Sequence, residues 1–347
     1  MKIKIKLIPL FQKFIRESET GKRRKLNGEK LREGSIQNYH SALKLLNKFC
    51  TETNFEFRGC DVNKLTNREF ISEKRYWKSF YTKYSNYLYK NGCYDNYVGT
   101  NFKHIRAFFN YLKKEKNINI GDFHKSFYVR KHEIDIKVLS PEQLKFLIHN
   151  KDFERSLPPH QQKIKDVFVF GCTTGLRFSD IDALTIQNFE FIEDTWYVKV
   201  RTKKTKTYTF IKLPDYAVDI FMKYRTKYKT KTLFQLMCLD NFNKQLKKIG
   251  RKAGWTESAE HYREKLGKAY KVKMGSKRKT EFCDFMSSHM MRRTAITTML
   301  ILGMPEHLVR NVSGHTNNSQ SFFKYVHYAQ SYTDKEISKV HEKLNQY

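Results

Sequence analysis

Three apolar stripes at helical spacing constrain the first third of the chain more than any other feature does. In each stripe an apolar residue returns every three or four positions, which is the period of one helix face and not of a strand. This part of the chain is therefore predicted to be a helical domain. The stripes are Ile36, Tyr39, Leu43, Leu46 and Phe49; Trp77, Phe80, Tyr81, Tyr84 and Leu88; and Ile105, Phe108, Phe109 and Leu112.

A domain boundary is predicted where this periodicity lapses, near residues 125–139. A strong helix start follows it. Ser140 is the expected N-cap, Pro141 the first helical residue, and Gln143 the second member of a capping box. A fresh helix after an irregular basic segment indicates a second domain. The predicted division is a helical domain at 1–125, a linker at 126–139 and a further domain with a C-terminal tail at 140–347.

The second domain is predicted to mix helices with a small β-sheet. Apolar residues alternate with polar ones in two short runs, around Val198 and around Ile211, as expected for two strands of a hairpin. Lys203, Lys204 and Lys206 fall in the turn between them. Residues 257–283 are polar and basic, and a loop or irregular helix is expected there. The whole chain is thus expected to be mainly α with a small β-sheet.

The charge balance points to a polyanionic partner. Lys and Arg number 67 and Asp and Glu number 35 among 347 residues, a formal net charge of +32. Nucleic acid is the usual partner of so basic a chain, because each neutralised phosphate releases counterions. No apolar run approaches the roughly 18 residues of a membrane span, and the six cysteines show no metal-binding or disulfide spacing. We expect a cytoplasmic, nucleoid-associated protein that has no membrane span, metal or other cofactor.

In the second domain, two arginines, a lysine, two histidines and a tyrosine follow one another in an order that suits a single reaction, the transfer of a phosphodiester. In an H-x-x-R run, His289 and Arg292 lie three residues apart, so on a helix they share a face and reach one ligand. Together with the residues before and after them, they could clamp a phosphodiester while a phenol oxygen attacks it. The set is Arg177, Lys204, His289, Arg292, His315 and Tyr325.

Five sequence boxes resemble those of tyrosine recombinases of the phage integrase family, and they occur in the family's order. The resemblance implies a helical core-binding domain followed by a mixed α/β catalytic domain. It also implies a site-specific recombinase that cleaves and rejoins DNA through a covalent 3′-phosphotyrosine, without metal or ATP. The boxes are Thr174–Asp180, Lys204 in its hairpin turn, Ser288–Thr294, Ser313–His315 and Tyr325–His327.

Chemistry supports the same roles. Arg177 and Arg292 offer planar guanidinium forks to the nonbridging oxygens, where negative charge gathers in the transition state. Asp180 is expected to hold Arg177 in place. His315 is expected to donate a hydrogen bond to a nonbridging oxygen.

Proton transfer needs two further groups. Tyr325 is the expected nucleophile, and a free phenol is largely protonated at neutral pH because it titrates near ~10. His289 is expected to accept that proton, and Lys204 is the candidate general acid for the leaving 5′-oxygen. Neighbouring Lys203 and Lys206 are alternatives to Lys204.

The position of the tyrosine departs from the family pattern. Tyr325 lies ten residues after His315, whereas family members commonly place the tyrosine about nine residues after this histidine. Tyr328 and Tyr332 are the nearby rivals. The phrase Phe322–His327 resembles the family's tyrosine box and favours Tyr325.

Further basic residues are candidates for contact with double-stranded DNA. They include the run Lys22–Lys25 and the side of the third predicted helix that lies opposite its apolar stripe. By resemblance, four protomers act on two DNA sites, and residues 330–347 could dock on a neighbouring protomer. The candidate DNA-contacting residues are Lys103, Arg106, Lys113, Lys203, Lys206 and Arg293.

Three alternative functions remain at the level of the sequence. A type IB topoisomerase-like enzyme shares the chemistry, but the two-domain size and the box spacing argue against it. A DNA-binding protein without catalysis is disfavoured by the intact set of basic residues and the tyrosine. A metal-dependent nuclease would need a cluster of carboxylates, which the sequence does not suggest.

Overall fold

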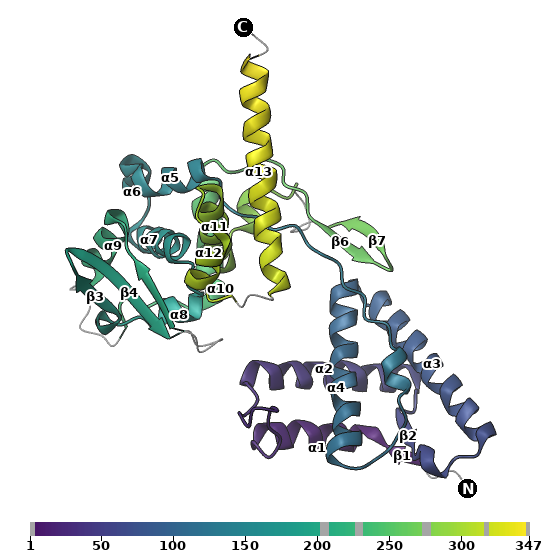
Figure 1. The fold of residues 1–347 in the computed structure, drawn as a ribbon. Coiled ribbons are helices and arrows are strands. Elements are labelled where there is room, and N and C mark those ends of the chain that lie inside the picture. The colour runs from purple at the N-terminus through teal and green to yellow at the C-terminus, as the bar shows by residue number, and fades with distance from the viewer. Residues whose placement is uncertain (1–3, 202–207, 226–231, 273–278, 316–318, 345–347) are drawn as a thin grey trace. The chain divides into compact units, whose positions relative to one another are not determined.

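The computed structural model describes residues 4–201, 208–225, 232–272, 279–315 and 319–344, and the chain divides into two compact units (Figure 1). Both units are mostly helical and the sheets are small, as the sequence predicts. Unit 1 comprises Met1–Ile134 and Tyr262–Val272, and unit 2 comprises Asp135–His261 and Lys273–Tyr347. The predicted turn with Lys203, Lys204 and Lys206 lies outside the described residues.

Helices packed around an aromatic core form unit 1. The predicted apolar stripes lie on its second, third and fourth helices, and Trp77, Phe80 and Phe108 are almost fully buried among them. A two-stranded antiparallel pair, β1 (Lys4–Lys6) with β2 (Arg58–Cys60), accompanies the helices. The helices are α1 (Leu7–Glu19), α2 (Glu33–Thr53), α3 (Asn67–Lys90) and α4 (Asp95–Glu115), with short 3₁₀ turns η1 (Val62–Lys64) and η2 (Phe123–Ser126).

A β-hairpin from the second half of the sequence completes unit 1. Strands β6 (Tyr262–Lys265) and β7 (Lys268–Lys271) form it, so the expectation of a loop or irregular helix here was wrong. The buried carboxylate of Asp95, at the start of α4, accepts hydrogen bonds from the backbone N–H groups of Leu266 and Gly267, each at 2.9 Å. Because of these contacts the hairpin belongs with the first unit, although its sequence position lies within the predicted second domain.

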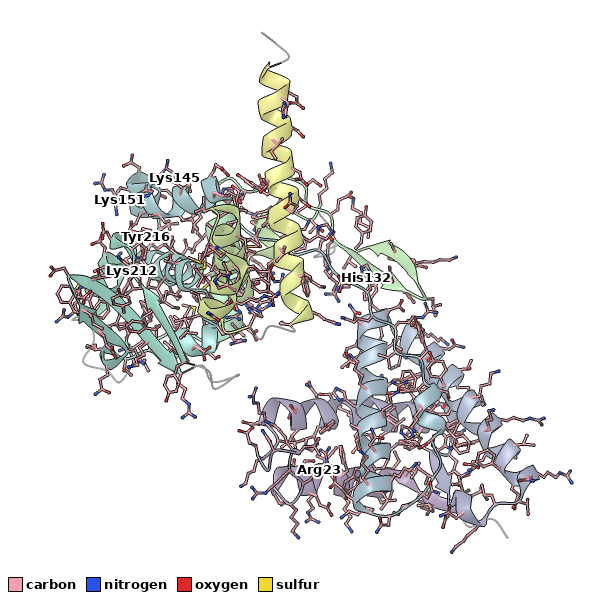
Figure 2. The ribbon with its side chains drawn as sticks, viewed as in Figure 1. Arg23, His132, Lys145, Lys151, Lys212 and Tyr216 are labelled. Atoms are coloured by element: carbon pink, nitrogen blue, oxygen red, sulfur yellow. The ribbon has the colours of Figure 1, made fainter. Side chains whose placement is uncertain are left out.

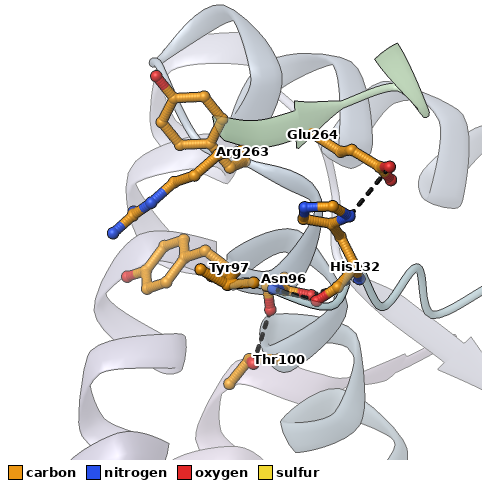
Figure 3. Close-up of a pocket in the computed structure, with 8 residues that line it drawn as sticks. Asn96, Tyr97, Thr100, His132, Arg263 and Glu264 are labelled. Carbon is orange, nitrogen blue, oxygen red and sulfur yellow. Dashed lines mark hydrogen bonds and ion pairs between the residues drawn. The ribbon is translucent and has the colours of Figure 1, made fainter. Parts of the chain in front are cut away.

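A cavity lies between strand β6 of the hairpin, the start of α4 and the chain around His132. Its volume is about 290 Å³. His132 Nδ1 lies 2.9 Å from a carboxylate oxygen of Glu264, and Asn96 donates to the backbone carbonyl of His132 at 2.9 Å (Figure 3). Arg263 lies over the ring of Tyr94. These contacts hold the hairpin against α4.

Unit 2 surrounds a three-stranded antiparallel sheet with helices. The sheet order is β3-β4-β5, and Val198 pairs with Ile211, which confirms the predicted hairpin strands and adds β3. The strands are β3 (Phe189–Ile192), β4 (Thr195–Arg201) and β5 (Tyr208–Lys212). The helices are α5 (Pro141–His149), α6 (Lys151–Ser156), α7 (Pro159–Thr174), α8 (Phe178–Asp182), α9 (Asp215–Arg225), α10 (Leu239–Lys252), α11 (Ser288–Ile301), α12 (Glu306–Ser313) and α13 (Gln320–Leu344), with 3₁₀ turns η3 (Ile186–Asn188) and η4 (Phe282–Phe285).

A capping box fixes the start of the first helix of unit 2, and the close contact of α7 with α11 fixes the centre of the unit. The capping box is present as predicted: Ser140 Oγ accepts from the backbone N–H of Gln143, and the Gln143 side chain accepts from that of Ser140. Helices α7 and α11 cross where Gly171 leaves room for Met291, since a Cβ atom on Gly171 would lie 2.5 Å from the Met291 sulfur. This close approach sets the position of α11, which carries the H-x-x-R residues.

Basic side chains extend from the surface of both units (Figure 2). In unit 2, Lys145 and Lys151 project from α5 and α6 and are exposed. Of the helices in the described part of the chain, none combines the length and the apolar character needed to cross a membrane.

Candidate active site

Arg292 joins two of the predicted sequence boxes in the interior of unit 2. Its side chain is 4% exposed, and Nη1 donates a hydrogen bond to the backbone carbonyl of Gly175 at 2.9 Å. Nη2 donates to the backbone carbonyl of Ser313. The H-x-x-R helix is therefore attached to the first arginine box on one side and to the Gly-His box on the other.

Backbone conformation at Gly175 directs Arg177 into this cluster. Gly175 ends α7 in the left-handed region, with φ +66°, which glycine adopts without steric cost. The chain then reverses, and Arg177 is the N-cap of α8. Its Nη1 atom is buried and has no hydrogen-bond partner among the described residues. Because a buried donor without a partner costs free energy, this position suits an incoming acceptor such as a phosphate oxygen.

Two guanidinium groups share the cluster without full neutralisation. The pKa of Arg292 is lowered to about 10, first by burial and then by the positive charge of Arg177. Tyr325 and Asp180 act in the opposite direction. Arg292 still carries its charge at neutral pH, so the cluster concentrates positive charge in a region of low dielectric.

His315 lies against the same guanidinium. Gly314 ends α12 in the left-handed region (φ +60°), and the backbone N–H of His315 donates to the carbonyl of Arg310 at 2.9 Å. Burial lowers the pKa of His315 to about 4, and the charges of Arg292, Arg177 and Arg310 act in the same direction. The imidazole is therefore neutral at neutral pH.

Tyr325 reaches the cluster from α13. Its side chain is 7% exposed, and its ring lies edge-on to His315 with 5.9 Å between the ring centroids. Of the two rivals, Tyr332 donates to the carboxylate of Glu142, and burial raises the pKa of Tyr328. The described contacts of the tyrosines thus place the ring of Tyr325 beside the imidazole and the charge of Arg292.

The other predicted catalytic residues lie at the margin of the cluster or outside the described part of the chain. His289 is in the first turn of α11, three residues before Arg292, and is exposed. Asp180 is buried in α8, and its backbone N–H donates to the carbonyl of Arg177 at 2.8 Å. Lys204, Lys203 and Lys206 lie outside the described residues.

The predicted DNA-contacting residues of α4 differ in their surroundings. Lys103 is exposed, whereas Lys113 forms an ion pair with Asp122 at 2.9 Å. Arg106 donates from Nε to the carbonyl of His124 and from Nη2 to the carbonyl of Phe127, at 3.1 and 2.5 Å. No observation tests a contact of Arg106 with DNA, but these two donors are already engaged with the chain that follows α4.

Two further candidates are partly buried. In the basic run Lys22–Lys25, Arg23 (labelled in Figure 2) lies over the ring of Phe14 and pairs with Glu115 at 3.3 Å. Arg293 is half-buried beside Arg292 on α11. Arg23 serves the packing of unit 1, and a role of either residue near DNA stays a prediction.

Sequence reasoning missed the groups that position the cluster. Ser313 is buried, and its Oγ lies 2.7 Å from His315 Nδ1. Arg310 is buried over the ring of Phe322 and is paired with Glu306. Ser313 directly precedes the Gly-His pair in the sequence, yet no pattern there indicates that its hydroxyl reaches the ring.

Among the described residues, Glu281, Cys283 and Asp284 lie close enough together to share a metal ion. The Arg251 guanidinium donates to Glu281 at 2.9 Å and to Asp284 at 3.4 Å. A cation of the protein itself is therefore already paired with both carboxylates.

Comparisons with known proteins agree with one another on the family and the fold of this chain. A sequence model described as "Phage integrase family" matches residues 137–331, more than half of the chain. The solved structures of similar fold include the XerH site-specific recombinase bound to a palindromic difH substrate, with a TM-score of 0.60 and 13% identity, covering 95% of this chain and 84% of that one. A comparison with curated protein sequences finds no match.

Two further solved structures share the fold. The Tn1549 transposon integrase in complex with circular intermediate DNA has a TM-score of 0.60 and 14% identity, and the match covers 98% of this chain and 100% of that one. A lambda integrase dimer bound to a COC′ core site has a TM-score of 0.59 and 11% identity, covering 93% and 77%.

The fold and the arginine-rich cluster define a tyrosine-type site-specific recombinase. The chain belongs to the phage integrase family.

Proposed function

We propose that this recombinase cleaves and rejoins the strands of double-stranded DNA through a covalent 3′-phosphotyrosine on Tyr325. One observation carries the proposal. Arg177, Arg292, His315 and Tyr325 come from four separate segments of unit 2 and meet in one cluster, where a buried Arg177 N–H has no partner among the described residues.

The guanidinium groups supply the charge stabilisation. In phosphoryl transfer, negative charge gathers on the nonbridging oxygens, and preorganised donors stabilise it most in the transition state. Arg177 and Arg292 take this role, the latter held in place by two backbone carbonyls. Since these cations supply the positive charge, the scheme requires no metal ion.

Protons move between side chains during the exchange. The Tyr325 oxygen attacks phosphorus while its proton passes to a histidine, for which His289 is the proposed acceptor. The bond from phosphorus to the 5′-oxygen breaks, and Lys204 gives that oxygen a proton. The phosphotyrosine conserves the energy of the broken bond, so a 5′-hydroxyl of another strand reverses the reaction without ATP.

DNA as the substrate is supported by charge and by the related structures. The +32 net charge suits a polyanion, and the similar solved structures are complexes with DNA. Exposed Lys103 is a proposed phosphate contact, together with Lys203, Lys206 and Arg293. We further propose that four protomers act on two DNA sites, with residues 330–347 contacting a neighbour. A type IB topoisomerase-like activity is the second candidate, since the chemistry is shared.

A nicked suicide duplex that carries the target site tests the proposal. The wild-type protein is expected to form a covalent protein–DNA adduct in EDTA. Tyr325→Phe is expected to abolish the adduct while gel-shift binding persists, with Tyr332→Phe as the matched control that keeps the adduct. An adduct that persists in Tyr325→Phe contradicts the assignment of the nucleophile. Exchange between two sites, as opposed to relaxation of supercoils, separates recombinase from topoisomerase.

A further inference from the structure

The hydroxyl of Ser313 lies between two acceptors. Ser313 is 2% exposed and sits in the last turn of α12. Its Oγ lies 2.6 Å from the backbone carbonyl of Val309 and 2.7 Å from Nδ1 of His315, with the carbonyl of Arg310 at 3.3 Å. A serine hydroxyl has a single hydrogen to donate but also accepts hydrogen bonds through its lone pairs.

One tautomer of His315 satisfies both short contacts. If Ser313 donated to Nδ1, its oxygen would face the Val309 carbonyl oxygen at 2.6 Å with no hydrogen between them. If Nδ1 carries the hydrogen and donates to Oγ, the hydroxyl is free to donate to the carbonyl. This second arrangement forms a chain of two hydrogen bonds in which each strengthens the other.

Arg292 does not determine the tautomer. Its Nη2 atom is nearly equidistant from the two ring nitrogens, at 3.3 Å from Nδ1 and 3.5 Å from Nε2. The same Nη2 is already engaged with the Ser313 carbonyl. The position of the ring hydrogen therefore depends on Ser313.

We propose that Ser313 is a positioning residue that fixes the hydrogen of His315 on Nδ1 and leaves Nε2 as a proton acceptor in the DNA-free enzyme. The role in catalysis rests on the proposed function. His315 then begins the reaction as an acceptor and donates to a nonbridging oxygen only after Nε2 has taken up a proton from solvent, while the Tyr325 proton passes to His289. Ser313 thereby sets which ring nitrogen carries the hydrogen and which carries the lone pair.

The tautomer of a catalytic imidazole affects the rate of the reaction as well as the packing of the ring. In a serine-protease triad, an imidazole held in the wrong tautomer costs about 10⁴ in kcat. Loss of the Ser313 hydroxyl frees both tautomers without enforcing the wrong one, so we expect a smaller loss of cleavage rate, roughly 10-fold.

The test is a two-bond ¹H–¹⁵N correlation spectrum of the DNA-free protein with ¹⁵N in the histidine rings. At pH 7.5, the His315 signals, assigned by their loss in His315→Gln, are expected to show hydrogen on Nδ1 and a lone pair on Nε2. In Ser313→Ala the pattern is expected to move toward hydrogen on Nε2, and Ser313→Thr, which keeps a hydroxyl, is expected to restore it.

Ser18→Ala is the matched control. Ser18 is also a buried helical serine whose Oγ donates to the carbonyl four residues earlier, that of Phe14, at 2.8 Å. Ser18 Oγ also accepts from Nη1 of Arg23 at 3.4 Å, and none of its contacts among the described residues is with a histidine. Its loss therefore tests the removal of such a serine hydroxyl away from His315. We expect no change in the His315 signals and no change in the rate of adduct formation.

Three results would overturn the proposal: hydrogen on Nε2 in the wild type, an unchanged His315 pattern in Ser313→Ala, or unchanged adduct formation despite a changed tautomer. Failure of the proposed function is a separate result. It appears as a wild-type protein that forms no adduct, whatever the spectrum of His315 shows.

Discussion

Arg292 and Gly175, which are 117 positions apart in the sequence, are joined by a hydrogen bond of 2.9 Å from the guanidinium to the backbone carbonyl. The carbonyl belongs to the left-handed cap that ends α7, and two residues later Arg177 enters the same cluster. One of the two proposed catalytic cations is thus held by the turn that positions the other. The two arginines therefore differ in what they contribute to folding.

Arg292→Gln is expected to destabilise unit 2. Two buried carbonyls, those of Gly175 and Ser313, lose their donor, and each unsatisfied buried polar group costs about 1–3 kcal/mol. Urea unfolding should show the loss, and adduct formation should disappear. A variant with wild-type stability would contradict the structural part of this argument.

Arg177→Gln is expected to remove adduct formation without such a loss of stability. The substitution relieves the repulsion that adds to burial in lowering the pKa of Arg292, and it removes a buried Nη1 donor that has no partner among the described residues. We expect a free energy of unfolding within about 1 kcal/mol of wild type, or above it, because one unsatisfied buried group is lost. A loss as large as that of Arg292→Gln would show that Arg177 has a structural role.

The stability of the DNA-free protein is expected to depend on His315 between about pH 4 and 6.5. The folded-state pKa is lowered to about 4 from an ordinary value near ~6.5, so the unfolded chain binds more protons in this window. This contribution to stability is complete above pH 6.5 and is lost as the pH falls toward 4. His315→Gln should show a shallower decline than wild type when thermal unfolding is followed across the window. Parallel curves would contradict the pKa shift.

Lys103→Ala and Arg106→Ala are expected to have opposite signatures, although both residues lie on α4. Lys103 is exposed, so its loss should leave stability unchanged and reduce the slope of log K against log salt by about 1, as expected for one phosphate contact. Arg106 holds backbone carbonyls beyond α4, so its loss should lower the melting temperature and leave the salt slope unchanged. DNA-binding titrations at several salt concentrations, with thermal melts, distinguish the two.

Gly171→Ala is expected to destabilise unit 2 by about 1–3 kcal/mol. The added Cβ would lie 2.5 Å from the Met291 sulfur and 3.0 Å from its Cβ, so α11 must shift and carry Arg292 with it. Adduct formation should slow as well. Gly34→Ala is the matched control, since a Cβ on this helical glycine of α2 meets nothing within 4 Å and is expected to be neutral or slightly stabilising. Equal effects of the two substitutions would contradict the packing argument.

Local features of the sequence were enough for much of the fold. The apolar stripes, the capping box at Ser140 and the alternating strands around Val198 and Ile211 depend on neighbours a few residues away, and the structure confirms them. The hairpin β6–β7 was missed because polar, exposed strands show no apolar alternation. Its docking depends on Asp95, far away in the sequence.

The sequence by itself determined the family and the order of the site residues, because each box is a short run whose residue types are visible in one dimension. Only the tertiary structure decided which donors are already in use. Arg106 donates to backbone carbonyls, a buried donor of Arg177 has no partner in the described part of the chain, and Ser313 contacts His315. Hydrogen-bond partners and burial depend on segments that meet only after the helices pack, so no local pattern encodes them.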